Sequence, residues 1–154
     1  SDGTPLELFG GKQGSLAVFT VAALMKSVPM IYNGQEVGCN QRLSFFNNST
    51  PIDWTTNPDM TAVYKRIIAF RKSSDAVKTG ALSSFSSDDV CAFTKTAAAR
   101  QVFVIANLRN RPVTYTVPAA LTHSGWRNAL NGDNVSLWES VVLQPYDYLV
   151  LRND

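Results

Sequence analysis

The chain has 154 residues, of which 45% are hydrophobic and 10% aromatic, and this is enough apolar material for one domain or two small ones. Lysine and arginine outnumber aspartate and glutamate by only 14 to 12 and are scattered, so no nucleic-acid-binding surface is indicated. Cys39 and Cys91 stand far apart and outside any CxxC or Cys/His spacing. This favours two free thiols over a disulfide framework or a zinc site.

The first predicted element is a helix over residues 15–28, SLAVFTVAALMKSV, which is apolar nearly all round and therefore suits burial on more than one side. Ser15 is its expected N-cap, and Pro29 ends it. Residues 16–25 are too few to span a bilayer, so no membrane segment is predicted. A short apolar run at residues 30–32, closed by Asn33-Gly34, is typical of a strand covered on both faces.

A second helix is predicted over residues 57–74. Asn57 is its expected N-cap, Pro58 occupies the first helical position, and Asp59 lies in the first turn, where the helix dipole favours an acid. Its helical spacing places six side chains in one stripe: Met60, Val63, Tyr64, Ile67, Ile68 and Arg71. We expect the apolar part of this stripe to pack against a neighbouring layer.

Beyond Gly80 the period changes from helical to two, which is typical of strands. Strands are predicted at residues 90–94, 102–106, 113–117, 126–130 and 146–151. Several short alternating strands separated by turns favour an antiparallel sandwich or barrel. The change of pattern divides the chain into residues 1–76 and 77–154.

Residues 14–38, GSLAVFTVAALMKSVPMIYNGQEVG, resemble the seventh helix and eighth strand of the α-amylase superfamily barrel. The family's P-x-I-Y-x-G-x-E-x-G pattern is matched at Pro29, Ile31, Tyr32, Gly34, Glu36 and Gly38. Residues 51–54 and 64–72 resemble the segment before the eighth helix and that helix itself, and the later strands resemble the family's all-β C-terminal domain. The resemblance implies an α+β fragment, in which two helices and a short strand left over from a (β/α)8 barrel precede an antiparallel β-sandwich.

The resemblance also implies a parent enzyme that cleaves α-1,4-glucosidic bonds with retention, using carboxylates at the ends of earlier barrel strands. The last of these acids follows a histidine in the family, whereas the only histidine here, His123, precedes Ser124 and is expected in a sandwich loop. We therefore expect a truncated, catalytically inactive piece with no catalytic residue of its own. No cofactor or metal site is predicted in it, and any calcium site of the parent would be assembled largely from residues upstream.

Asn33, Gln35 and Glu36 follow the predicted barrel strand and are the candidate substrate-binding residues, at the lip of the parent's active site. The favoured alternative is that Glu36 accepts hydrogen bonds from loop backbone and is structural. Three tryptophans, Trp54, Trp126 and Trp138, could stack on sugars, but a core or interdomain role is favoured for them. The Asp88-Asp89 pair is predicted to be a solvated turn, because adjacent residues on a strand point to opposite faces.

Two functions remain. The favoured one is the non-catalytic terminal part of an enzyme that degrades α-glucans such as starch, in which the sandwich stabilises the barrel. The alternative is a free-standing starch-binding sandwich module, which would not need the first 74 residues. A third reading, an unrelated α+β domain, is disfavoured by the length of the match. If the first reading is right, apolar barrel surface and strand edges are uncovered, and the fragment should self-associate, swap elements or be disordered in its first part. The compartment is left open, because an export signal would lie upstream.

Overall fold

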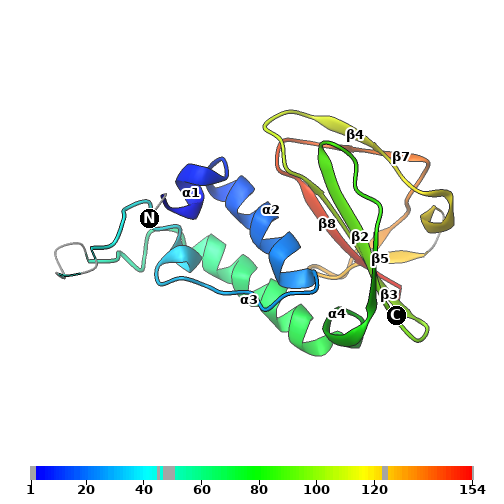
Figure 1. Ribbon diagram of the computed structural model, residues 1–154, viewed down its shortest axis with the longest axis horizontal. Helices are drawn as coiled ribbons and strands as arrows, with labels where there is room; N and C mark the ends of the chain where they lie inside the picture. The colour runs from blue at the N-terminus through cyan, green and yellow to red at the C-terminus, as the bar shows by residue number, and fades with distance from the viewer. Residues whose placement is uncertain (1–2, 45, 47–50, 123–124, 154) are drawn as a thin grey trace.

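The computed structural model describes residues 3–44, 46, 51–122 and 125–153, which form a helical part packed beside an antiparallel β part (Figure 1). The helical elements are α1 (Pro5–Leu8), α2 (Gly11–Leu24), the 3-10 turn η1 (Gln35–Val37), α3 (Pro58–Ser73) and α4 (Asp75–Thr79). Within the described ranges no helix is long and apolar enough to cross a membrane.

Helix α2 corresponds to the first predicted helix but is displaced toward the N-terminus. It begins at Gly11 after Gly10, whose φ of 79° is left-handed, and it ends at Leu24. Ser15 therefore lies inside the helix, 2% exposed, and its prediction as the N-cap is wrong. The preceding short helix α1 has its own capping box, in which Thr4 and Glu7 bond each other's backbone.

The C-terminal end of α2 is held by Arg71 of α3. The Arg71 guanidinium donates to the carbonyl oxygens of Ala23 at 2.6 Å and Ser27 at 2.7 Å. The Ala23 carbonyl lies in the last turn of α2, at the negative end of the helix dipole, so a cation there satisfies it and stabilises the terminus, and the Ser27 contact holds the chain that follows. Arg71 therefore links α3 to the C-terminal end of α2 and is not simply a basic residue in the last turn of α3.

Residues 30–32 do not form the predicted strand. Val28, Met30 and Tyr32 are 91%, 75% and 55% exposed, respectively. A strand needs a neighbour that completes its hydrogen-bond ladder, and among the described residues none pairs with this segment. The Tyr32 amide instead donates to Oε1 of Gln35 at 3.1 Å.

Helix α3 confirms the second predicted helix, with Pro58 in its first turn and Asn57 in the N-cap position. Its buried side chains are Met60, Tyr64, Ile67 and Phe70. The Asn57 amide does not cap its own helix but donates to the carbonyl of Val37 at 2.9 Å. Asn57 therefore fastens η1 to the start of α3.

The β part contains a six-stranded sheet in the order β1-β2-β3-β8-β5-β6 and a two-stranded sheet, β4-β7, with antiparallel pairing throughout. Its elements are β1 (Ala81–Ser84), β2 (Val90–Ala97), β3 (Arg100–Asn107), β4 (Val113–Thr116), the 3-10 turn η2 (Ala119–Leu121), β5 (Trp126–Asn128), β6 (Asn134–Val135), β7 (Ser140–Leu143) and β8 (Tyr148–Arg152). All five predicted strands are present. The sequence prediction missed β1, β6 and β7.

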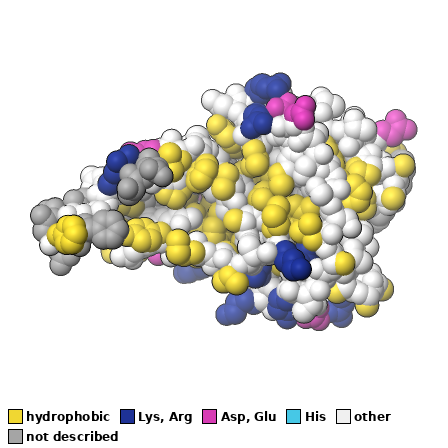
Figure 2. Space-filling model, viewed as in Figure 1, with side chains coloured by type: hydrophobic (Ala, Val, Ile, Leu, Met, Phe, Trp, Pro, Cys, Tyr) yellow, Lys and Arg dark blue, Asp and Glu magenta, His cyan; other side chains and the backbone are white. Residues whose placement is uncertain are grey.

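The six-stranded sheet has a hydrophobic core on each face. On one face Phe93, Val104 and Val150 pack with side chains of α2, α3 and α4. On the other, Phe103 and Trp126 pack with residues of the β4-β7 sheet. The stripe of α3 thus packs against the sandwich, and the predicted boundary after residue 76 falls inside α4. Figure 2 shows hydrophobic side chains gathered over the helical part and its junction with the sheet, with Lys and Arg mostly toward the edges.

Asp89 is more than part of a solvated turn. Its carboxylate accepts from Arg109 at 2.9 Å and Arg111 at 2.5 Å, which joins the turn before β2 to the turn before β4. The hydrogen bond from Arg109 lowers the pKa of the Asp89 carboxyl, assisted by the charges of both arginines. Because the pKa is lowered in the folded state, this contribution to stability is present near neutral pH and is lost as the pH falls through that pKa.

Candidate functional site

The three candidate lip residues lie on and beside η1, a turn that two glycines make possible. Gly34 and Gly38 have φ values of 86° and 63°, which are left-handed. A Cβ on Gly38 would lie 2.7 Å from the Met60 sulfur and 2.9 Å from Nδ2 of Asn57. The turn is therefore pressed against the first residues of α3, which fixes the direction of its side chains.

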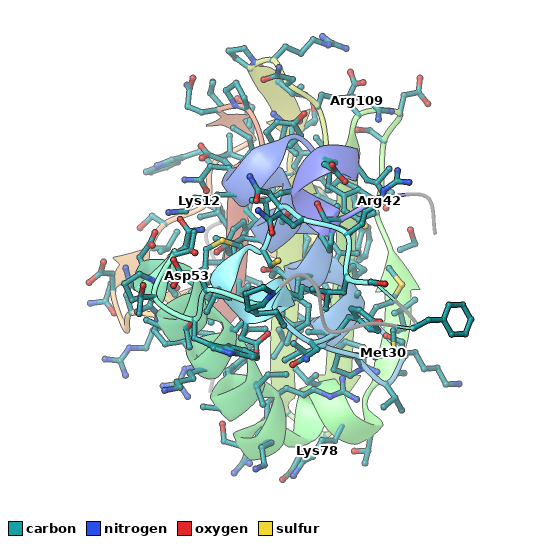
Figure 3. The ribbon with its side chains drawn as sticks, turned by 90° about the vertical axis from the view of Figure 1, so that its left-hand side faces the viewer. Lys12, Met30, Arg42, Asp53, Lys78 and Arg109 are labelled. Atoms are coloured by element: carbon teal, nitrogen blue, oxygen red, sulfur yellow. The ribbon has the colours of Figure 1, made fainter. Side chains whose placement is uncertain are left out.

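Two hollows flank this turn and separate the candidates. The first, here called the loop cavity, has a volume of about 570 Å³ and is lined by Asn33 and Gln35 together with Met30 and Arg42. Met30 and Arg42 lie on the same side of the molecule when the helical end faces the viewer (Figure 3). The second, here called the helix groove, has about 450 Å³ and is lined by Glu36 and side chains of α3. Asn33 and Gln35 therefore lie together, and Glu36 faces a different space.

The amide of Gln35 is already engaged within the chain. Its oxygen accepts from the Tyr32 amide, and its nitrogen donates to the Tyr64 hydroxyl at 3.1 Å. Burial raises the pKa of Tyr64, so the hydroxyl keeps its proton. Gln35 braces the exposed 30–32 segment against α3, a contact that the sequence pattern did not reveal.

Glu36 is held through its backbone, whereas one oxygen of its carboxylate has no partner among the described residues. Thr61 Oγ1 donates to the Glu36 carbonyl at 2.9 Å. Oε2 is buried and has no hydrogen-bond partner among the described residues. The expectation that loop backbone donors satisfy this carboxylate is therefore wrong for Oε2. A buried carboxylate oxygen without a hydrogen-bond donor lowers the stability of the fold. The helix groove therefore lacks a donor for Oε2 among the described residues.

Four other carboxylates of the helical part are tied to local partners. The pKa of Glu7 is lowered by the backbone amide of Thr4 and that of Asp53 by the hydroxyl of Thr55. Hydrogen bonds from Lys12 and Lys78 lower the pKa of Asp59 and Asp75, respectively. The Asp59–Lys12 ion pair is 2.6 Å long. Carboxyl groups with a lowered pKa stay ionised near neutral pH and are unsuited to donate a proton as a general acid.

The tryptophans divide between core and surface. Trp126 is 1% exposed and its indole nitrogen donates to the Leu121 carbonyl at 3.0 Å, which confirms the core prediction. Trp54 and Trp138 are 52% and 63% exposed, so neither lies in the core, and an interdomain role for them stays a prediction. His123 lies outside the described residues. Both cysteines are free thiols, and the described ranges hold no group of three acidic, histidine or cysteine side chains that could bind a metal ion.

The architecture on which this site is built, two long helices packed on an antiparallel sandwich, is that of the C-terminal part of α-amylase-type glycoside hydrolases. A curated relative is Alpha-amylase 2 of Dictyoglomus thermophilum, 26% identical over an alignment that covers 84% of this chain and 24% of that protein. No family model matches the chain.

Solved structures show the same fold. The α-amylase of Geobacillus thermoleovorans in complex with acarbose gives a TM-score of 0.76 at 15% identity, covering 92% of this chain and 33% of that protein. The trehalulose synthase MutB of Pseudomonas mesoacidophila gives 0.76 at 16% identity, covering 97% and 41%. The cyclic α-maltosyl-(1→6)-maltose hydrolase of Arthrobacter globiformis gives 0.70 at 19% identity, covering 94% and 31%. The chain thus spans a quarter to two fifths of these relatives, and the resemblance deduced from its motifs is confirmed.

Proposed function

We propose that this chain is the C-terminal part of an α-amylase-type glycoside hydrolase that acts on α-glucans, and that this part supports the barrel without supplying a catalytic carboxylate. Asn33, Gln35 and Glu36 then lie at the rim of the parent's active site, where Gln35 and Glu36 position the rim and Asn33 faces substrate. No cofactor is assigned to this part, and a calcium ion of the parent would be bound elsewhere.

The observation that carries this proposal is the uncovered segment between α2 and α3. Val28, Met30 and Tyr32 are exposed apolar side chains on a stretch with which no strand of the described residues pairs. Beside it the helix groove holds a buried carboxylate oxygen with no donor among the described residues. A preceding and a following barrel unit would cover the apolar side chains and bring backbone donors to the edge of this segment.

The alternative, a free-standing starch-binding module, has less support. A free-standing sandwich module would fold without the helices. In this chain, however, Leu16, Phe19 and Tyr64 of the helices share one core with the six-stranded sheet. Removing the helices would uncover Phe93, Val104 and Val150, which are at most 1% exposed. The helices are therefore integral to the fold of the sandwich.

The test is hydrolysis of a chromogenic maltooligosaccharide by two proteins: this chain alone, and a chimera in which the chain replaces the matching quarter of the Dictyoglomus relative. We expect no turnover from the chain and turnover from the chimera, because the chemistry resides upstream and the chain completes the barrel. Turnover by the chain alone would contradict the proposal and return Glu36 to consideration as a catalytic residue. A folded but inactive chimera would also count against it.

The isolated chain is expected to self-associate through the same uncovered segment. Burying Val28 and Met30 against a second copy removes apolar surface from water, which is worth about 25 cal/mol per Å². The double variant Val28→Ser, Met30→Ser should shift the sedimentation-velocity distribution toward monomer. The control is Val142→Ser, which removes a side chain 60% exposed on β7 and should leave the distribution unchanged. A wild-type chain that remains monomeric at high concentration would refute this prediction.

A further inference from the structure

Two asparagines of the chain are each followed by a glycine, in the pairs Asn33-Gly34 and Asn131-Gly132. Asparagine is a thermolabile residue, and a following glycine exposes it most, because no Cβ hinders the approach of the next backbone nitrogen to the side-chain carbonyl carbon. Both glycines have a left-handed φ of 86°. The two pairs therefore agree in composition and in the turn geometry of the glycine, and they differ in the contacts of their polar groups.

The polar groups of Asn131-Gly132 are held by hydrogen bonds in the turn between β5 and β6. The Gly132 amide donates to the Asn128 carbonyl at 2.8 Å. The Asn131 side chain donates to Oδ2 of Asp133 at 2.7 Å and accepts from the Asp133 amide at 3.0 Å. The backbone nitrogen and the side-chain amide that it would attack are thus both engaged, so a reaction between them has to disrupt these bonds.

The same groups of Asn33-Gly34 are unengaged. Neither the exposed Asn33 side chain nor the Gly34 amide forms a hydrogen bond within the described part of the chain. Gly34 itself is buried, but both residues line the loop cavity, which gives solvent access to the pair. The backbone around them is fixed, since the Gln35 amide donates to the Tyr32 carbonyl at 2.8 Å. The Cys39 amide likewise donates to the Gly34 carbonyl at 2.9 Å. The turn is therefore closed without using the two groups that can react.

We infer that Asn33 is a site of spontaneous deamidation in the folded chain, whereas the turn between β5 and β6 protects Asn131. Base removes the proton of the Gly34 amide, and the nitrogen attacks Cγ of Asn33. The new C–N bond closes a succinimide ring, and the side-chain nitrogen takes up a proton and leaves as ammonia. One water molecule then adds to either ring carbonyl and opens the ring, which gives aspartate or isoaspartate. The reaction needs only this chain and water.

The reaction changes the turn that carries Gln35. Either product places a carboxylate on the wall of the loop cavity, which Arg42 also lines. Isoaspartate in addition inserts one CH2 group into the main chain, inside the turn that the bond from Gln35 to Tyr32 closes. The side-chain amide of Gln35, which links Tyr32 to Tyr64, is then displaced. That the altered turn lies at the rim of an active site rests on the proposed function, whereas the reaction itself does not.

The test is peptide mapping by mass spectrometry of the dilute 154-residue chain, incubated in mildly alkaline buffer and, in parallel, unfolded in urea. Conversion is measured as the mass change from amide to acid, and isoaspartate is detected by enzymatic methylation of its carboxyl group. In buffer we expect residue 33 to convert about tenfold faster than residue 131, in line with the hydrogen bonds that hold the latter. In urea the two rates should be similar, because both pairs are Asn-Gly and their folded contacts are lost.

The matched control is Asp133→Ala, which removes one of the hydrogen bonds that hold Asn131. This variant should speed conversion at residue 131 and leave the rate at residue 33 as it was; an unchanged rate at residue 131 would overturn the protection of that turn.

Three results with the wild-type chain would overturn the inference. The first is equal conversion of residues 33 and 131 in buffer. The second is an unreactive residue 33 over a period in which the urea-unfolded chain converts. The third is a tenfold difference that persists in urea, because the flanking residues and not the fold would then set the two rates. None of these readouts involves hydrolysis of a glucan, so this test and the chimera succeed or fail independently.

Discussion

Replacing Gly14 by alanine is expected to destabilise the fold by about 3 kcal/mol, although alanine is normally the better helix former. A Cβ at this position in α2 would lie 1.4 Å from the Phe9 carbonyl oxygen and 3.3 Å from Cδ1 of Tyr146. The first contact is with backbone and cannot be relieved by rotating a side chain. Helix α1 would have to move away from α2.

Thermal unfolding measures this effect, with an expected fall in Tm of roughly 6–12 °C for a chain of this size. The matched control is Gly125→Ala, because a Cβ there meets no atom of the described residues within 4 Å. Its unfolding should stay close to that of the wild type. If Gly14→Ala were equally harmless, the close approach of α1 to α2 would be wrong.

The helices show where local sequence is sufficient and where it is not. The signals that predict α3 are Pro58 at its start and a regular apolar stripe along it. Both belong to the helix's own sequence, so the prediction was correct. For α2, Ser15 has the chemistry of a cap, but the helix starts earlier because Gly10 turns the chain directly out of α1. The tight packing of Gly14 on Phe9 is a tertiary constraint that capping preferences do not encode.

The strands and the candidate site show the same limit. Residues 30–32 have the composition of a buried strand, but a strand also needs neighbours, and none pairs with them in the described part of the chain. Strand β1 is exposed at all four positions, and β6 has two residues, so neither carries a period-two signal. The motif groups Asn33, Gln35 and Glu36 after the predicted strand, but it does not reveal their separation into two hollows, which depends on contacts with α3.

The second large effect is expected at Asn107, which is completely buried at the end of β3. Its amide nitrogen donates to the carbonyls of Arg111 at 2.8 Å and Gln144 at 2.9 Å, and its oxygen accepts from the Arg109 amide at 2.9 Å. One side chain therefore fastens the turn before β4 to the end of β7. Asn107→Asp replaces the donor with a carboxylate oxygen that faces two carbonyls. We expect about 3 kcal/mol of destabilisation at pH 7.

The pH dependence of Asn107→Asp distinguishes this mechanism from a simple packing defect. Burial and the facing carbonyl oxygens raise the pKa of the introduced carboxyl in the folded state above its unfolded value of about 3.9. The destabilisation relative to the wild type should therefore be full above the folded pKa and shrink as the pH falls toward the unfolded one, because the protonated acid again donates. Urea unfolding between pH 7 and pH 4 measures this change in stability.

Two variants serve as controls. Asn107→Ala should lose stability without this pH dependence. Asn110→Asp, at an exposed position in the same turn, should lose little stability at any pH. A constant deficit in Asn107→Asp across this range would show that the amide is not the donor that joins the two turns.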